Sequence, residues 1–204
     1  MFLKIDDVNE SYTNTLLLLR ALNKTKFSIF LSVIWSWVDT QSIKELISVR
    51  KKIIPVFHWY NHVSSEFLSS SRDQLSSFIR GEIFFKIFNP SYKFFSPPFN
   101  NMNQNTIRYL TLFWYTGIIA DYKSLRNFDF SWKKLTIFTT NIFLNKKNKD
   151  GSWFLEDRKR TLSEAEYISW RRLHIWFELH PQYLTFEQVL EVAETLIFIE
   201  KIYG

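Results

Sequence analysis

The stretch from Asn105 to Asn141 constrains the fold most, because it combines a helix pattern, a glycine stop and two strand patterns. Apolar residues recur at helical spacing over residues 105–116, which predicts an amphipathic helix of about three turns. Gly117 follows where a helix closes with a left-handed residue, so a positive φ is expected there. Residues 118–122 and 134–140 are typical of two strands separated by a polar turn. We therefore expect one unit in which the helix covers a small sheet.

A second helix pattern stands near the start of the chain. Residues 6–23 carry apolar side chains at helical period, and Asp6 or Asp7 is in position to cap the helix, with Glu10 reaching back. The residues that follow, 27–33, alternate apolar and serine side chains and predict a strand. This part of the chain is therefore expected to supply one helix and then one strand.

The stretch 34–103 has a different, aromatic-rich character. We expect a helix over 40–49, strands over 53–60 and 83–88, and a loop or helix cap in the serine-rich segment 64–77. The stretch is interpreted as an insertion that separates two parts of one domain.

Residues 145–204 contain several short apolar runs between charged turns. Strands are expected over 152–160, 165–170 and 173–179, then a short helix capped by Thr185 and an apolar closing strand. The fold class that results is α/β (α+β), with an N-terminal helix–strand–helix–strand–strand unit, an insertion, and a mostly β C-terminal part with one short helix. The corresponding ranges are 1–33 with 104–144, 34–103, and 145–204.

Composition narrows the class and suggests an origin. There are 21 Phe and 8 Trp but only 4 Gly and no Cys, which fits an AT-biased genome that reads a stop codon as Trp, as many mitochondria do. The lack of cysteine excludes a disulfide framework and a thiolate metal site. Residues 1–10 do not resemble a secretory signal, and the apolar run 27–38 falls short of the roughly 20 residues that a membrane-spanning helix needs. A net charge of +6 permits a polyanionic partner.

The order of these elements resembles the universal, bacterial-type eighth protein of the small ribosomal subunit, in a divergent mitochondrial form. Residues 17–22 (LLLRAL) stand where that family has a Thr-Arg-Ile-Arg-Asn-Ala-like helix motif and keep only its second arginine, as Arg20. The run 117–123 (GIIADYK) matches the family's helix stop and following strand. Residues 134–138 (KLTIF) suit its next strand, and 184–190 suit its capped helix. The segment 178–182 replaces the family's hydroxyl-rich loop, so the resemblance is strongest in the central unit.

The resemblance implies a structural constituent of the mitochondrial small ribosomal subunit that binds rRNA and supports translation, without catalysis, cofactor or metal. Its partners would be small-subunit rRNA and neighbouring mitochondrial ribosomal proteins, the latter through the insertion, and its location the mitochondrial matrix. Cations would contact phosphates, and side chains of the altered loop would contact RNA sugars. The implied RNA-binding residues are Arg20, Lys24, Lys26, Lys123, Lys133, Lys134, His180, Gln182 and Thr185.

Two other functions stay open. An accessory structural subunit of an organellar respiratory-chain complex would also explain the aromatic surplus and modest charge, and a nucleic-acid-binding enzyme subunit ranks below both. His58 and His62 lie four residues apart, a spacing that binds metal on a helix, but the surrounding pattern predicts a strand and no third ligand is nearby. Because no glycine-rich phosphate loop, paired carboxylate motif or nucleophile motif is evident, the chain is predicted not to be an enzyme.

Overall fold

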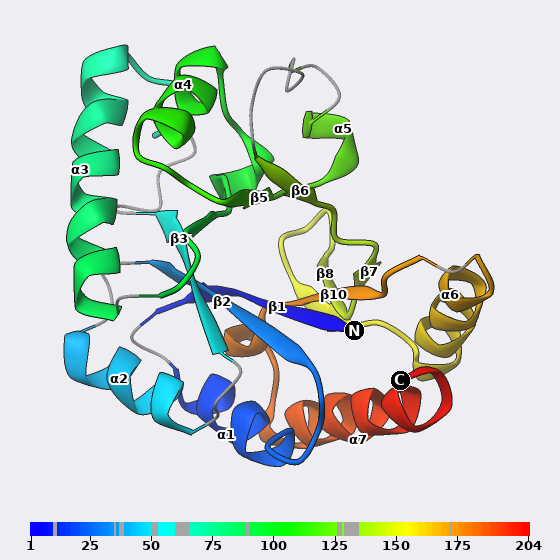
Figure 1. The fold of residues 1–204 in the computed structure, drawn as a ribbon. Helices are drawn as coiled ribbons and strands as arrows, with labels where there is room; N and C mark the ends of the chain where they lie inside the picture. Colours follow the sequence, from blue (N-terminus) through cyan, green and yellow to red (C-terminus); the bar gives the residue numbers. More distant parts are fainter. Residues whose placement is uncertain are drawn as a thin grey trace.

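An eight-stranded parallel sheet forms the centre of the computed structural model (Figure 1). Its strands are β1 (Phe2–Val8), β2 (Ser28–Ile34), β3 (Ile53–Trp59), β4 (Phe94–Phe95), β5 (Gly117–Ile119), β6 (Thr136–Phe138), β7 (Ile142–Phe143) and β10 (Trp176–Leu179). The strand order is β6-β5-β4-β3-β2-β1-β10-β7. The structure describes residues 1–9, 12–34, 36, 39–49, 53–59, 66–88, 90–125, 128, 135–171 and 173–204.

Helices alternate with most of these strands, as parallel pairing requires. The helices are α1 (Thr13–Ala21), α2 (Thr40–Ser48), α3 (Ser71–Phe88), α4 (Gln104–Leu112), α5 (Tyr122–Leu125), α6 (Arg158–Trp170) and α7 (Phe186–Tyr203), with short 3₁₀ turns η2 (Pro98–Asn100) and η3 (Pro181–Tyr183). A separate two-stranded antiparallel hairpin is formed by β8 (Asn145–Lys147) and β9 (Trp153–Leu155). The α/β prediction is thus confirmed, whereas the predicted topology is not.

The sheet curls into a barrel that is not hydrogen-bonded between its two edge strands, β6 and β7. Read around the curl, the strands follow one another in chain order, as in (β/α)-barrels. Phe138 of β6 and Trp176 of β10 lie far apart in strand order, yet their ring centroids are only 4.8 Å apart. The inside of the curl is filled by an aromatic-rich cluster consisting of Phe30, Val56, Phe94, Ile119 and Trp176, with Phe2, Ile54 and Phe138 packed against it.

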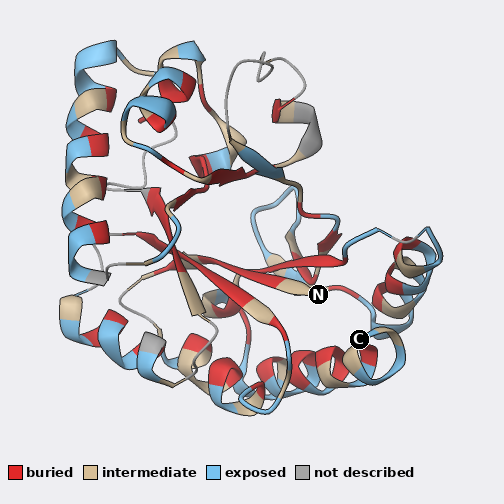
Figure 2. Cartoon of the chain, in the orientation of Figure 1, coloured by how far each residue is buried: buried red, intermediate tan, exposed pale blue. Residues whose placement is uncertain are grey.

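A larger apolar core lies between the sheet and the helices. Helices surround the outside of the curl and turn their buried residues towards it (Figures 1 and 2). Helix α7 shows why: Val189, Val192, Leu196 and Ile199 are buried at i, i+3, i+7 and i+10, which is one helical face. Among the described residues no helix is both long and apolar enough to cross a membrane.

The C-terminal prediction of mostly β structure is wrong, since α6 and α7 occupy ranges in which strands were expected. The run 196–202 continues α7, whose N-terminus has a capping box between Thr185 and Gln188. Thr185 as a helix cap and a strand within 173–179 are confirmed. The strand predicted over 83–88 belongs to helix α3 instead.

Two predictions about single residues near helix ends are also wrong. Asp6 and Asp7 do not cap a helix but end strand β1, while α1 begins at Thr13. Gly117 does not have a positive φ; the left-handed residue after α4 is Trp114, with φ 59°. Gly117 begins strand β5, where a Cβ atom would lie 2.7 Å from the carbonyl oxygen of Thr136.

The stretch 34–103 supplies β3 and β4 to the middle of the sheet. The ranges 1–33, 104–144 and 145–204 supply the other strands. All of these ranges therefore contribute strands to one sheet. The interpretation of 34–103 as an insertion stays a prediction.

Candidate functional site

Four titratable side chains meet at one edge of the curled sheet. Asp6 and Asp7 lie at the end of β1, His58 near the end of β3, and His180 directly after β10. Since all three strands are parallel, their carboxyl ends lie on the same side. Ligand and catalytic sites in parallel α/β folds occur at this edge.

Backbone irregularities turn these side chains toward a common point. The register of β1 against β2 shifts between Ile5 and Val8, and Asp7 has a φ of 53°. Consecutive strand residues normally point to opposite faces, but a bulge with a left-handed residue re-aims a side chain. The pairing of β2 with β3 shifts in the same way around His58. A left-handed aspartate is also strained backbone of the kind that gathers at functional sites.

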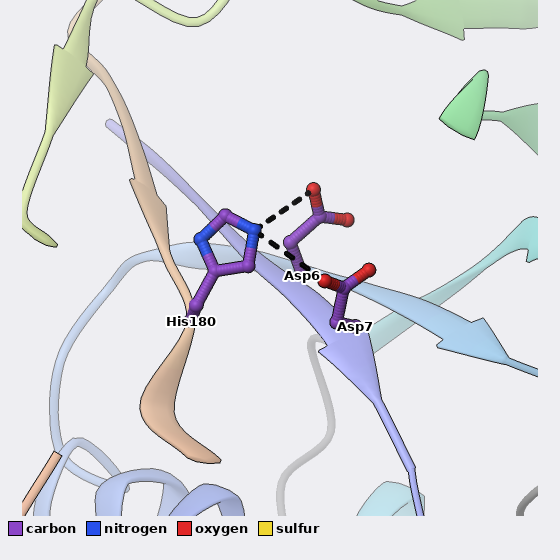
Figure 3. Close-up of side chains that lie close together, drawn as sticks. All are labelled: Asp6, Asp7 and His180. Atoms are coloured by element: carbon purple, nitrogen blue, oxygen red, sulfur yellow. Dashed lines mark ion pairs between the residues drawn. The ribbon is translucent and has the colours of Figure 1, made fainter. Parts of the chain in front are cut away.

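The nitrogen and oxygen atoms of the four side chains lie close together. Nε2 of His58 is 2.9 Å from Oδ1 of Asp7 and 3.5 Å from Oδ1 of Asp6. Nε2 of His180 lies 3.7 Å from an Oδ2 atom of each aspartate, as the dashed lines of Figure 3 show. Asp6, Asp7 and His180 can each offer a ligand atom within 4.8 Å of the others.

The tautomer of His58 is fixed by its surroundings. Its Nδ1 lies 2.9 Å from the backbone carbonyl oxygen of Ser96, which can only accept, so Nδ1 carries a hydrogen and donates it. Nε2 of the neutral ring therefore presents a lone pair to the Asp7 carboxylate. Two lone pairs do not meet at 2.9 Å without a bridge, so either a proton or a metal cation lies between Nε2 and the carboxylate. Metal-binding histidines are commonly oriented by this kind of Nδ1–H bond to a carbonyl.

A buried lysine lies beneath the two aspartates. The Nζ atom of Lys4 is 2.7 Å from Oδ2 of Asp6 and 3.4 Å from Oε2 of Glu178, and its side chain is only 3% exposed. Burial lowers the pKa of Lys4, but the charges of Asp6 and Glu178 outweigh it, so the pKa lies above its usual value. Burial likewise raises the pKa of Asp6, while His58 and Lys4 more than offset this and hold it below the usual value. The site therefore contains a carboxylate and an ammonium at neutral pH.

His180 is held by the β8–β9 hairpin. The buried side-chain amide of Asn145 accepts a hydrogen bond from the backbone N–H of His180 and donates one to its carbonyl, both at 2.9 Å. The ring of Trp153 lies 4.7 Å from the imidazole and stacks on Tyr183 at 4.4 Å. The two hydrogen bonds with Asn145 and the contact with Trp153 together hold His180 in place.

These residues surround a pocket of about 330 Å³. A volume of this size suits a small organic group or a single sugar unit. Charged residues line one part of the pocket, and aromatic residues from the hairpin and two loops line the rest. The lining residues are Lys4, Asp6, Asp7, His58, Pro97, Phe99, Asn100, Lys147, Trp153, Glu178, His180 and Tyr183.

Among the predicted RNA-binding residues whose side chains the structure describes, His180 alone lines this pocket. Arg20 is exposed at the end of α1, 4.0 Å from Glu45, and Lys24 and Lys26 are exposed nearby. Gln182 lies in η3 beside the pocket, and Thr185 caps α7. The side chain of Lys123 and all of Lys133, Lys134 and His62 lie outside the described residues.

Lys4, Asp6, Asp7 and Glu178 are site residues that were not predicted from the sequence. Two signals were available: Asp6-Asp7 is a carboxylate pair directly after an apolar run, and His58 follows another such run. A helix cap and a strand histidine are common explanations for these residues, so neither signal is decisive alone. Their coincidence at parallel strand ends is visible only in three dimensions.

A curled parallel α/β sheet with polar side chains gathered at its carboxyl edge occurs in proteins of many activities. No family model matches the sequence, and comparison with curated proteins finds no significant relative. Among solved structures, the chain is similar to a putative polysaccharide deacetylase from Mycobacterium smegmatis, with TM-score 0.69 and 13% identity over 98% of this chain and 84% of the other.

Two further solved structures share the fold at similarly low sequence identity. A chitin deacetylase from the fungal pathogen Colletotrichum lindemuthianum matches with TM-score 0.61 and 17% identity, over 99% of this chain and 81% of the other. A CE4 family pseudoenzyme from Bacillus anthracis matches with TM-score 0.65 and 12% identity over 99% of this chain. The present chain spans only 61% of that protein. At these identities the similarity shows a shared fold.

These similarities overturn the ribosomal prediction. The structural neighbours are carbohydrate esterases, deacetylases and related pseudoenzymes, so the resemblance to the eighth small-subunit protein is wrong, and so is the respiratory-subunit alternative. The predicted rRNA and ribosomal-protein partners and the mitochondrial matrix location rested on that resemblance and are corrected with it. The prediction that the chain is not an enzyme is contradicted by the same neighbours.

Proposed function

We propose that the chain is a metal-dependent hydrolase that removes acyl groups from a glycan. The observation that carries the proposal is the contact of 2.9 Å between Nε2 of His58 and Oδ1 of Asp7, two acceptor atoms in the neutral-ring tautomer. Imidazole nitrogen and carboxylate oxygen are both good ligands for a divalent cation, which can take the place of a proton shared between them. We assign the cation to Asp7 and His58.

The charge of the site supports this assignment. The side chains of Asp6, Asp7 and Glu178 are 8%, 13% and 9% exposed, and Lys4 is the cation that neutralises part of them. With neutral imidazoles, three nearly buried carboxylates and one ammonium leave an excess of negative charge, which is costly away from water. A bound divalent cation would remove that excess.

Asp6 and His180 are placed to move protons. A bound cation would polarise the acyl carbonyl and lower the pKa of a water molecule. Asp6 keeps Oδ2 on Lys4, while Oδ1, which has no hydrogen-bond partner among the described residues, is left to take a proton from that water. Nε2 of His180 lies 3.7 Å from both aspartates and is placed to give a proton to the leaving nitrogen or oxygen.

The choice of an acylated glycan as substrate is supported by the fold. The similar structures are named as deacetylases of chitin, peptidoglycan and polysaccharide. The pocket, with charged groups at its floor and aromatic rings at its walls, has the composition of a site for a polar molecule with flat apolar faces.

Acetate release from N-acetylated oligosaccharides tests the proposal. The protein is purified, supplied with Zn²⁺ or Co²⁺, and incubated with chitotetraose and with peptidoglycan fragments. We expect release by the wild type, and a loss of roughly 10²- to 10⁴-fold in kcat for Asp6→Asn, because the general base is removed. Glu194→Gln on the exposed face of α7 is the control and should keep full activity. Unchanged release by Asp6→Asn would reject Asp6 as the general base, and no release from any acylated glycan with either metal would reject the hydrolase.

A further inference from the structure

The β8–β9 hairpin presents a cation and an aromatic ring on one face. Lys147 and Trp153 are direct partners in its antiparallel register, so their side chains lie on the same side of the hairpin. Both line the pocket that holds Asp6, Asp7 and His180. The hairpin thus adds a second, chemically different wall to the candidate site.

This wall is held rigidly beside the reacting groups. Asn145, at the start of β8, clamps the backbone of His180 with two hydrogen bonds of 2.9 Å. Trp153 is stacked on Tyr183 with an interplanar angle of 8°. A side chain of the hairpin therefore keeps a nearly constant distance from His180, which is what substrate selection requires.

Lys147 differs from Lys146 in that its ammonium forms no ion pair among the described residues. The ammonium of Lys146 is 2.7 Å from Glu156, whereas none of the ion pairs among the described residues includes Lys147. Lys147 is exposed and turned to the pocket, while Lys4, the other lysine of the pocket, is already paired with Asp6 and Glu178. The charge of Lys147 is thus available to a bound molecule.

The aromatic residues of the pocket define the rest of the ligand. Tyr183 is 44% exposed, and Phe99, which comes from another loop, is 61% exposed with a left-handed φ of 46°. A bulky residue in that conformation is strained, and exposing its ring loses apolar contact, so the loop geometry favours a role in binding. Rings beside a cation suit a pyranose that carries an anionic substituent.

We propose that the hairpin face of Lys147 and Trp153 is a subsite for an acidic sugar unit next to the acylated one. The anionic group, a carboxylate in the first instance, pairs with Lys147, and the sugar ring lies along the aromatic wall. This inference rests on the proposed glycan hydrolase and narrows its substrate to acidic glycans. Because the pair would be partly solvated, its contribution is about fivefold in affinity.

The test uses one glycan in two charge states. Hyaluronan tetrasaccharide and its carboxyl-reduced form share the N-acetylglucosamine units and linkages and differ only in the carboxylates. Binding to the Zn²⁺-loaded protein is measured by calorimetry, and acetate release is measured in parallel. The variants are Lys147→Ala, Lys147→Arg and, as a control of equal charge change on the same hairpin, Lys149→Ala, whose side chain is exposed in the turn and does not line the pocket.

The wild type, Lys147→Arg and Lys149→Ala should bind the acidic tetrasaccharide about fivefold more tightly than the reduced one, and Lys147→Ala should lose this preference. The preference should also shrink as salt is raised. Equal binding of both sugars by the wild type, or an equal loss in Lys149→Ala, would overturn the subsite. A charge preference without acetate release would keep the subsite and reject the hydrolase, whereas release without preference would do the opposite.

Discussion

At the scale of single residues, the site depends on two interruptions of regular strand geometry. Leu3, Ile5 and Val8 are fully or almost fully buried, which holds β1 in the sheet up to its end. The register shift before Val8 then lets Asp6 and Asp7 face the same pocket. Asp is among the best helix caps, and this competing preference explains why the sequence predicts a cap here.

Replacing Lys4 tests whether the buried charges are matched as described. Lys4→Met keeps an unbranched side chain only one atom shorter but leaves Asp6 and Glu178 without their ammonium. We expect a loss of about 3 to 5 kcal/mol in the free energy of unfolding, measured by urea denaturation at pH 7. Adding Glu178→Leu to this variant should restore part of the loss, since one uncompensated charge is removed. Equal stability of Lys4→Met and wild type would show that these contacts are not present in solution.

A second residue carries a prediction about alkaline pH. Burial, and then the charge of Glu82, raise the pKa of Tyr115 well above its usual value of 10.0. The folded chain therefore keeps the phenol proton to higher pH than the unfolded chain, so its contribution to stability is complete below pH 10 and is lost as pH rises above it. The hydroxyl also has no hydrogen-bond partner among the described residues.

Tyr115→Phe should therefore be more stable than the wild type by about 1 kcal/mol at pH 7, because an unpaired buried hydroxyl is removed. The difference in stability between the variant and the wild type should depend on pH. Above pH 10 the unfolded wild type loses the Tyr115 proton while the folded protein keeps it, which favours unfolding of the wild type, so the difference in stability between the two proteins should widen as pH rises. Thermal unfolding from pH 7 to 11 measures the gap, and a gap that closes as pH rises would contradict the assigned shift.

At the scale of elements, the sequence predicts the helices and strands whose apolar residues follow a clear period. Helix α4, strands β2 and β3 and the strand within 173–179 lie where periodicity places them. The run 196–202 does not, because a short apolar run fits a strand and a buried helix equally well. The capping box of Thr185 and Gln188 was the signal that a long helix begins there.

Gly117 gives the prediction at this scale. A Cβ atom there would lie 2.7 Å from the carbonyl oxygen of Thr136 and 2.9 Å from the ring of Phe94, so β5 approaches β6 too closely for a side chain. Gly117→Ala should lower the free energy of unfolding by about 1 to 3 kcal/mol through steric strain. Gly151→Asn is the control, because Asn tolerates left-handed backbone and a Cβ atom there would meet only the flexible side chain of Lys147, at an ordinary contact distance of 3.8 Å. A Gly117→Ala protein as stable as this control would argue against the close approach.

At the scale of the whole molecule, the order of the strands around the curl decides both fold and site. The order of helices and strands along a chain is shared by many α/β folds, and this explains how it could suggest a ribosomal protein. Parallel pairing over long sequence separations is what brings His58 to Asp7, 51 residues earlier, and His180 to the same pocket. Residue spacing along the sequence carries no record of such pairing, so this part of the site could not be predicted.

Titration of the purified protein with Zn²⁺ tests the central claim, that Asp7 and His58 hold a cation at this edge of the sheet. Metal-free wild type, Asp7→Asn and, as a control for loss of one exposed carboxylate, Glu194→Gln are compared by calorimetry at pH 7. We predict one tight site in the wild type and in Glu194→Gln, and binding weakened by about 100-fold or more in Asp7→Asn, because a charged ligand is lost. Tight binding that survives Asp7→Asn unchanged, or no binding by the wild type, would contradict the claim.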